Sequence, residues 1–173
     1  THIIAITACG SLRKRISPGD FVFPDQFIDR TTKRINTFFD SSEVVHTPMG
    51  NPFSNQIRNC LIEAADQLKY RYHNKGTVVT IEGPRFSTKA ESMLFRSWGC
   101  DIINMSTVPE IVLARELKME YQSIAMSTDY DCWHENEEEV SMDIVYDTMK
   151  KNVENVKELI NQSIKIISEN ELR

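Results

Sequence analysis

The sequence lacks three features that would assign it to common protein classes: a long apolar run, an excess of basic residues, and a basic leader followed by an apolar stretch. Without about 20 consecutive apolar residues, we expect no membrane-spanning helix and no membrane partner. The net charge is -5, which argues against nucleic acid as a partner because phosphate backbones select basic surfaces. Without such a leader, we expect no secretion signal.

Cysteine is also scarce, and its spacing favours neither a metal site nor a disulfide framework. The four residues are Cys9, Cys60, Cys100 and Cys132, with no Cys-x-x-Cys pair among them. This spacing is typical of reduced thiols in a cytosolic protein. An initiator methionine is absent too, and the chain opens inside an apolar, β-branched run. We therefore expect a portion of the protein to precede Thr1.

The sequence does contain a regular alternation of short apolar runs and amphipathic segments. We expect strands at residues 2–6, 21–23, 77–81, 101–105 and 123–127. A small-residue turn is expected at 7–11 and a long functional loop at 29–51. The alternation of strands with helices is typical of an α/β fold.

Helices are expected between these strands, and each has a recognisable start. Ser54 is the predicted N-cap of the first helix. Two predicted capping boxes, Thr88 with Glu91 and Thr107 with Glu110, open the next two. The last helix is expected from about residue 141 to near the end of the chain. Its apolar stripe predicts a core-packing face made of Val145, Met149, Val153, Val156, Ile160, Ile164 and Ile167.

Four polar segments follow predicted strands, and we expect them to meet. They are Thr7–Ala8, Glu82–Ser87, Asn104–Ser106 and Asp129–Asp131. In α/β sheets, ligands bind outside the carboxyl ends of the strands, where such segments converge. The sequence therefore predicts one polar site at this edge of the sheet.

The paired carboxylates are the most informative part of that site. Asp129 and Asp131 are two residues apart, so both side chains point the same way on an extended backbone. Two carboxyl groups in a dry pocket do not both ionise readily, so one should hold its proton more tightly. A protonated carboxyl donates to a ring nitrogen and an ionised one accepts from an amine, which matches the edge of an aminopurine. Two alternatives stay open: solvated carboxylates in a loop, and a metal site completed by His134.

The remaining candidates each have a structural alternative as well. The small residues at 7–11 form either an anion cradle or an ordinary turn. Phe86 either stacks on a base or packs in the core. Ser106 either binds an anion at a helix N-terminus or caps that helix with Thr107. His46 lies in a loop, where a lone histidine is usually solvated.

Several runs, taken together and in order, carry a more specific signal. They are Thr7–Arg13, Pro18–Asp20, Asp25–Thr32, His46–Met49, Thr80–Ser87, Ala90–Ser92, Ile103–Met105, Val108–Glu110 and Ala125–Trp133. In this order they resemble the methylthioadenosine phosphorylase family, within the trimeric purine nucleoside phosphorylases. The resemblance covers essentially the whole chain.

The resemblance implies a fold, a reaction and a set of partners. The fold would be a single-domain, three-layer α/β/α structure with a mixed β-sheet, as in purine nucleoside phosphorylases. The reaction would be phosphorolysis of methylthioadenosine to adenine and 5-methylthioribose 1-phosphate. Inorganic phosphate would be a co-substrate, and neither a metal nor an organic cofactor would be needed. The protein would be a homotrimer in the cytoplasm, with the nucleus as a further location.

The resemblance also implies a role for individual residues. Asp129 would donate to the purine N7 and Asp131 would accept from the 6-amino group. Phosphate would be bound by Thr7, the Ala8 backbone and Ser106. The base, ribose and 5'-group would be contacted by Phe86, Ser87, Met105, Tyr130, Met142, Val145 and Tyr146, and His46 would reach into a neighbouring subunit's site.

Some positions depart from the family pattern. Ser106 stands where threonine is usual, so the hydroxyl is kept, whereas Met142 and Tyr146 are bulkier than the usual aliphatic residues of the 5'-pocket. Residues 1–173 would be the C-terminal part of a nucleoside phosphorylase domain. The family's glycine-rich first phosphate loop and its Arg-His-Gly segment would lie upstream of Thr1, so this fragment alone should be inactive.

Two alternative functions stay open. One is a phosphorylase acting on 6-oxopurine nucleosides such as inosine. An aspartate rather than an asparagine at the base-reading pair argues against it, because a carboxylate is left unpaired against a carbonyl. The other is a non-catalytic fragment that acts as an oligomerisation module.

Overall fold

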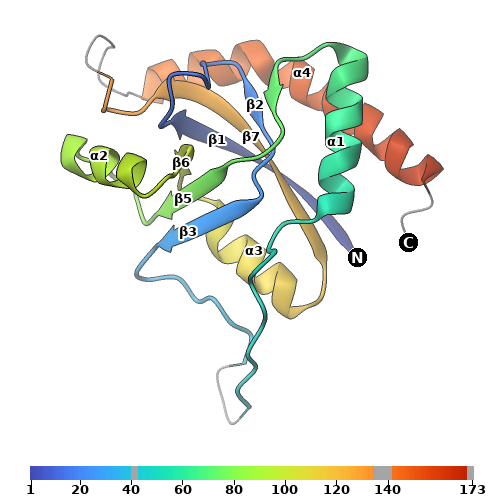
Figure 1. Cartoon of the computed structure of the whole chain (residues 1–173), viewed down its shortest axis with the longest axis horizontal. Coiled ribbons are helices and arrows are strands. Elements are labelled where there is room, and N and C mark those ends of the chain that lie inside the picture. Colours follow the sequence, from blue (N-terminus) through green and yellow to red (C-terminus); the bar gives the residue numbers. More distant parts are fainter. Residues whose placement is uncertain (40–42, 135–141, 171–173) are drawn as a thin grey trace.

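A mixed β-sheet forms the centre of the molecule, and helices cover both of its faces (Figure 1). The computed structural model describes residues 1–39, 43–134 and 142–170. Its strands are β1 (His2–Ser11), β2 (Phe21–Val22), β3 (Gln26–Arg30), β4 (Tyr72–His73), β5 (Thr77–Ile81), β6 (Ile102–Asn104) and β7 (Glu120–Tyr130). Its helices are α1 (Asn55–Leu68), α2 (Lys89–Ser97), α3 (Thr107–Glu116) and α4 (Met142–Glu169).

The strand order is β3-β5-β6-β1-β7-β2-β4. Most neighbouring strands are parallel, but β1 pairs antiparallel with β6, and β2 pairs antiparallel with β7. Successive side chains of β7 point to opposite faces. Ile124 and Met126 pack under α1 and α4, whereas Tyr121 and Ala125 pack against α3. The predicted α/β fold with a mixed sheet and three layers is therefore confirmed.

The central strands are longer than the sequence pattern suggested. The turn predicted at 7–11 is wrong, because β1 continues to Ser11. This part of β1 pairs with β7 on one side and with Ile102 and Ile103 of β6 on the other. Pairing on both sides satisfies its backbone groups, so small residues that resemble a turn in sequence remain extended.

The starts of the helices test the predicted caps. The Ser54 hydroxyl accepts from the Ile57 amide, and Thr88 with Glu91 forms a full capping box, so both predictions are confirmed. The box predicted for α3 is wrong. Asn104 donates to the Thr107 hydroxyl, and Tyr121 donates to the Glu110 carboxylate instead. The Thr107 hydroxyl and the Glu110 carboxylate therefore bind residues outside α3 and do not cap the helix.

The last helix packs on α1 by a slightly different face from the predicted stripe. Val156 is buried as expected, whereas Val153 and Ile164 are 43% and 53% exposed. The buried face includes Leu159 and Ser163 instead. Serine is tolerated there because its hydroxyl donates to the Leu159 carbonyl, so burial leaves no donor without a partner.

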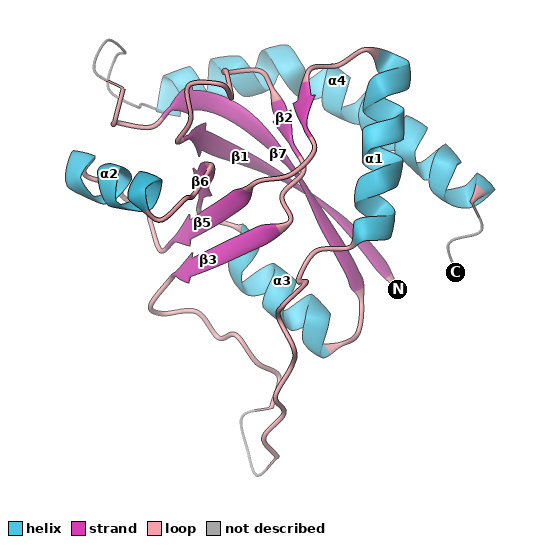
Figure 2. Cartoon of the chain, viewed as in Figure 1, coloured by secondary structure: helices cyan, strands magenta, loops and turns pink. Residues whose placement is uncertain are grey.

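The connections also differ in detail from the sequence pattern. The long loop begins at Thr31 rather than at residue 29, because β3 extends to Arg30 and pairs with β5. The described residues of 31–51 contain neither helix nor strand, as Figure 2 shows. Neither β3 nor the short strand β4 was predicted. No helix in the described part of the chain combines the length and apolar character needed to cross a membrane.

Candidate active site

A cavity of about 340 Å³ is lined by residues of β1, by the end of β6 and by the end of β7. Its lining residues are Ile6, Thr7, Ala8, Cys9, Gly10, Ile81, Phe86, Ser87, Ile103, Asn104, Met105, Ser106, Thr128, Asp129, Asp131 and Val145. All four of the polar segments expected to converge therefore contribute to one cavity. The sequence analysis expected these segments to meet because each follows the carboxyl end of a strand. That explanation is incomplete, because β6 runs antiparallel to β1 and the carboxyl ends of these two strands do not lie at the same edge of the sheet.

One end of the cavity presents two hydroxyl groups from distant parts of the chain. The Thr7 Oγ1 and Ser106 Oγ atoms lie 2.7 Å apart, and both residues line the cavity. Thr7 comes from β1, and Ser106 stands at the N-cap position of α3 without a side-chain capping bond. Hydroxyls that converge at a helix N-terminus suit an anion, since the helix dipole adds positive potential there.

A buried amide side chain holds this hydroxyl pair in place. Asn104 Nδ2 donates to Thr7 Oγ1 at 3.1 Å and to Thr107 Oγ1 at 2.7 Å. Its Oδ1 accepts from Thr80 Oγ1 at 2.9 Å. The amide is only 5% exposed and connects β5, β6 and β1. Fully partnered buried polar groups of this kind fix geometry, because every alternative arrangement leaves a group unpaired.

The carboxylate pair forms another part of the cavity wall. Asp129 and Asp131 are 8% and 3% exposed, so the solvated-loop alternative is wrong. An irregularity brings Asp129 opposite Gly10: β7 advances from Ser127 to Asp129 while β1 advances by one residue. Thr128 is thus the extra residue of a β-bulge, a device that re-aims side chains next to functional sites.

Gly10 packs directly against both carboxylate residues. A Cβ atom there would lie 3.1 Å from Asp129 Oδ1 and 3.4 Å from Asp131 Cβ. The first contact is tighter than ordinary van der Waals packing and the second lies at its lower limit, so a larger residue would push on Asp129 and touch Asp131. The same distances show that both carboxyl side chains lie beside Gly10, as their spacing predicted.

The electrostatics of the carboxylates follow from their burial. Burial raises the pKa of Asp131, whereas the Ser92 hydroxyl, the Cys132 amide and the Ser87 hydroxyl lower it by smaller amounts. Thr128 Oγ1 donates to Asp129 Oδ2 at 2.7 Å. Burial, and then the nearby Asp129, also raise the pKa of Cys9 well above its usual range, so that thiol stays protonated. An amine donor at Asp131 would offset the cost of its charge.

The apolar part of the cavity lies around Met105, Phe86 and Val145. Phe86 is 37% exposed at the edge of the cavity, so the alternative that it packs in the core is wrong. Gly83 has a φ of 67°, and a Cβ there would lie 2.5 Å from the Met105 sulfur. Arg34 donates to the Met105 carbonyl at 2.6 Å. The position of Met105 is therefore constrained from both sides.

Two of the residues predicted to contact substrate in this cavity, Tyr130 and Tyr146, do not line it. Tyr130 points away from its two neighbouring aspartates, and its ring stacks on His134 with centroids 4.9 Å apart. Tyr146 is 64% exposed, although the preceding Val145 lines the cavity. His46, which was predicted to reach a neighbouring subunit's site, lies in the 31–51 loop and lines a separate surface pocket. The side chain of Met142 falls outside the described residues.

The metal alternative is not supported by the arrangement of side chains. Within the described residues, no three His, Cys, Asp or Glu side chains are grouped so that they could hold a metal ion. Asp129, Asp131 and His134, all described, therefore do not form such a site.

Sequence reasoning missed the residues that support the site from behind. Asn104 was recognised only as part of a polar segment, and no role was predicted for Thr80, Thr128 or Gly10. The one visible signal was a threonine beside the apolar residues of β5 and an asparagine at the end of β6. Their pairing depends on strand register, which the local sequence does not reveal.

Comparison with known proteins gives a consistent picture. The model of the phosphorylase superfamily matches residues 1–165. The chain is 57% identical over 157 residues to S-methyl-5'-thioadenosine phosphorylase from Danio rerio, which covers 88% of this chain and 56% of that protein. It is 56% identical over 168 residues to the protein of the same name from Anopheles gambiae, covering 95% of this chain and 60% of the relative.

A solved structure of methylthioadenosine phosphorylase from Schistosoma mansoni in complex with adenine is also similar. Its TM-score is 0.93 at 41% identity, covering 97% of this chain and 65% of that chain. The chain thus spans less than two thirds of the length of each of these relatives.

Proposed function

The chain belongs to the phosphorylase superfamily, and we propose on this basis that the intact protein is a methylthioadenosine phosphorylase. It would convert methylthioadenosine and phosphate into adenine and 5-methylthioribose 1-phosphate. The observation that carries the proposal is one cavity that joins a hydroxyl pair, Thr7 and Ser106, to a buried carboxylate pair, Asp129 and Asp131. The relatives named for this activity, at 56–57% identity, support it.

The proposed binding mode assigns each part of the cavity to one part of the substrates. Phosphate would meet the Thr7 and Ser106 hydroxyls and the Ala8 backbone. Met105, which lines the same cavity, would contact the ribose. The base would lie against Phe86 and Ser87, with its polar edge toward the carboxylates. Val145 would face the 5'-methylthio group. The complex of the Schistosoma mansoni enzyme with adenine supports a purine as the ligand.

The chemistry follows from where charge develops. Breaking the glycosidic bond leaves positive charge on the ribose and negative charge on the departing purine. Phosphate stabilises the first, and a proton delivered by Asp129 to N7 relieves the second. One placed general acid contributes about 10²–10⁴-fold to the rate. Asp131 would accept from the 6-amino group, and thereby select aminopurines.

We also propose that residues 1–173 contribute to a single nucleoside phosphorylase domain that forms a homotrimer in the cytoplasm. His46 would reach a neighbouring subunit's site. In support, three apolar side chains of the same loop are strongly exposed: Ile35 at 79%, Phe38 at 53% and Val44 at 76%. A second copy of the chain would cover them. The four cysteines are free thiols, which fits a reducing compartment.

The test is to incubate the intact protein with methylthioadenosine, with and without phosphate, and to measure adenine release. We expect release that depends on phosphate. Phosphate-independent release would contradict phosphorolysis, and no release would favour the non-catalytic alternative. Faster turnover of inosine than of methylthioadenosine would favour the 6-oxopurine alternative.

A further inference from the structure

One backbone carbonyl holds both Asp131 and Trp133. The Ser11 carbonyl accepts from the Asp131 amide at 3.1 Å and from the Trp133 indole Nε1 at 2.7 Å. Asp131 is the first residue after β7, where the strand ladder ends. The end of β1 therefore fixes the Asp131 backbone and, two residues later, the indole ring.

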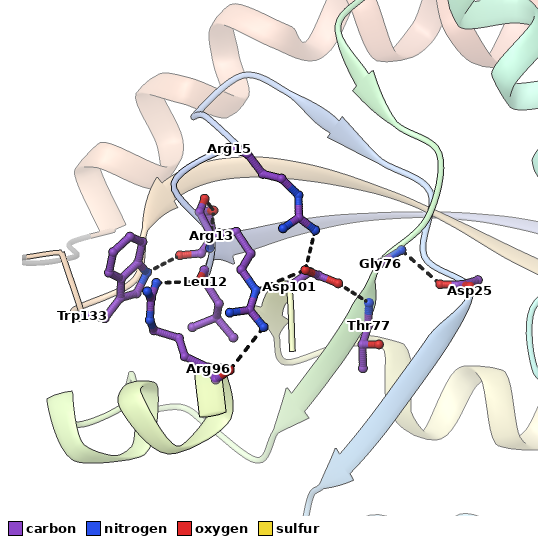
Figure 3. Close-up of polar contacts among 10 residues, drawn as sticks. Leu12, Arg13, Arg15, Asp25, Gly76, Thr77, Arg96, Asp101 and Trp133 are labelled. Carbon is purple, nitrogen blue, oxygen red and sulfur yellow. Dashed lines mark hydrogen bonds and ion pairs between the residues drawn. The ribbon is translucent and has the colours of Figure 1, made fainter. Parts of the chain in front are cut away.

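An arginine of α2 holds the other side of that ring (Figure 3). The Arg96 guanidinium carbon lies 3.5 Å from the Trp133 ring centroid, within the range of a cation–π contact. Arg96 Nη1 also donates to the Leu12 carbonyl at 2.6 Å. The contact thus attaches Trp133 to α2 and α2 to β1.

The arginine is itself anchored. Arg13 Nη2 donates to the Arg96 carbonyl, and Arg13 Nε pairs with Asp101 at 3.2 Å. Burial, and then the neighbouring Arg13, lower the pKa of Arg96, because both disfavour its charged form. The indole face and the Leu12 carbonyl offset that cost, so the guanidinium has little freedom to leave the ring.

The loop before α2 contacts the same segment from the cavity side. Cys132 Sγ donates to the Ser87 carbonyl at 3.3 Å, and Ser87 lines the cavity. Asp131, Cys132 and Trp133 are therefore held between β1 on one side and α2 with its preceding loop on the other. The backbone that carries the Asp131 side chain is thereby fixed on both sides.

We propose that Trp133 and Arg96 are positioning residues, which hold the Asp131 carboxylate where it distinguishes a 6-amino purine from a 6-oxo purine. The proposal rests on the proposed function. The Asp131 carboxylate can accept a hydrogen bond from a 6-amino group but not from a 6-oxo group. Displacing it therefore weakens adenine binding and leaves hypoxanthine binding nearly unchanged. The phosphate end of the cavity is supported separately by Asn104 and is unaffected.

The experiment compares Trp133→Phe with the unsubstituted intact protein by calorimetry with adenine and with hypoxanthine. Phenylalanine keeps a ring for Arg96 but removes the donor to Ser11. If the displaced Asp131 loses its hydrogen bond to the 6-amino group, adenine affinity should fall about five- to tenfold. The ratio of adenine affinity to hypoxanthine affinity should fall by a similar factor. Arg96→Lys keeps the charge but not the stacked plane, and should lower the ratio roughly two- to fivefold.

Trp98→Phe is the matched control. Trp98 follows α2 and is 45% exposed, and its ring contacts Arg30 and Phe95 rather than the Asp131 segment. Its loss should leave the ratio unchanged. An unchanged ratio in Trp133→Phe, or an equal fall in Trp98→Phe, would overturn the proposal.

A crystal structure of Trp133→Phe separates this proposal from the proposed function. A shift of the Asp131 carboxylate relative to Asp129 supports the positioning role even if the protein catalyses another reaction. An unmoved carboxylate overturns it. Failure of the proposed function would instead appear as a lack of phosphate-dependent adenine release in the unsubstituted protein.

Discussion

The hydroxyl oxygens of Thr7 and Ser106 lie 2.7 Å apart, although 99 positions separate the two residues in the sequence. The contact joins the middle of β1 to the start of α3. It forms only because β6 runs antiparallel to β1 and delivers its C-terminal end to that point. Two hydroxyl groups thus share one end of the cavity, where a phosphate would have both within reach.

Removing one of these hydroxyls should affect phosphate more than nucleoside. Ser106→Ala deletes a hydrogen bond to a charged group, worth about 1.5–3 kcal/mol, so the KM for phosphate should rise at least tenfold. The KM for methylthioadenosine should change by less than a factor of about three, because the base end of the cavity is untouched. Steady-state kinetics with each substrate varied in turn measure both effects. Ser106→Thr keeps the hydroxyl and should retain the phosphate KM; a loss as large as in Ser106→Ala would contradict the assignment.

The buried amide of Asn104 should matter for both stability and phosphate binding. Asn104→Ala leaves the hydroxyls of Thr80 and Thr107 without this partner, at a cost of about 1–3 kcal/mol in the free energy of unfolding. Urea denaturation measures this. Asn104→Asp keeps the acceptor for Thr80 but places a carboxylate behind Thr7, so it should raise the phosphate KM while adenine affinity is largely kept. Equal effects on phosphate and adenine would argue for general disruption instead.

A methyl group at position 10 should disturb the carboxylates. In Gly10→Ala the new Cβ would lie 3.1 Å from both Asp129 Oδ1 and Ile103 Cγ2, so the neighbours must move. We expect adenine affinity, measured by calorimetry, to fall roughly tenfold or more, since two hydrogen bonds to the base are strained together. Gly50→Ala is the control, because nothing lies within 4 Å of a Cβ at that position. If both variants bind adenine as the unsubstituted protein does, Gly10 is not needed for the carboxylate geometry.

The features that could be predicted from the sequence are those that depend only on residues close to one another in the chain. The spacing of Asp129 and Asp131 and the strand before them were enough to place both carboxyls on one side. The capping pattern of Thr88 with Glu91 is equally local, and it was confirmed. The similar pattern of Thr107 with Glu110 failed because Asn104 and Tyr121 compete for the same groups. Such competition depends on tertiary contacts, and no local pattern reveals it.

The missed features of the site all depend on register between distant strands. The antiparallel pairing of β1 with β6 brings Asn104 to Thr7, and the bulge at Thr128 brings Asp129 opposite Gly10. Neither follows from composition or periodicity. The alternation of side chains along β7 would have placed Tyr130 away from the cavity, had the strand been expected to reach that far.

Asp131→Asn should stabilise the fold at neutral pH. The folded-state pKa of Asp131 is raised by burial, so the folded protein resists ionisation that the unfolded chain accepts. The free energy of unfolding therefore falls as pH rises from the ordinary carboxyl range, about 4, through the raised value, and stays lower at neutral pH. Asparagine does not ionise, so the variant should have the higher Tm at pH 7, and the difference should vanish near pH 3.5. Asp147→Asn, at an exposed position of α4, should show no such difference.

The same substitution should change the pH dependence of ligand binding. Adenine binding to the unsubstituted protein requires an ionised Asp131, so its affinity should fall as pH drops through the raised pKa, at a higher pH than for an ordinary carboxyl. Asp131→Asn removes this dependence, because the amide oxygen accepts from the 6-amino group at every pH. The amide nitrogen can also donate to a 6-oxo group, so the affinity for hypoxanthine should rise. Calorimetric titrations of both bases between pH 5 and 8 test this, since an identical pH profile in the two proteins would show that Asp131 does not contact the 6-position.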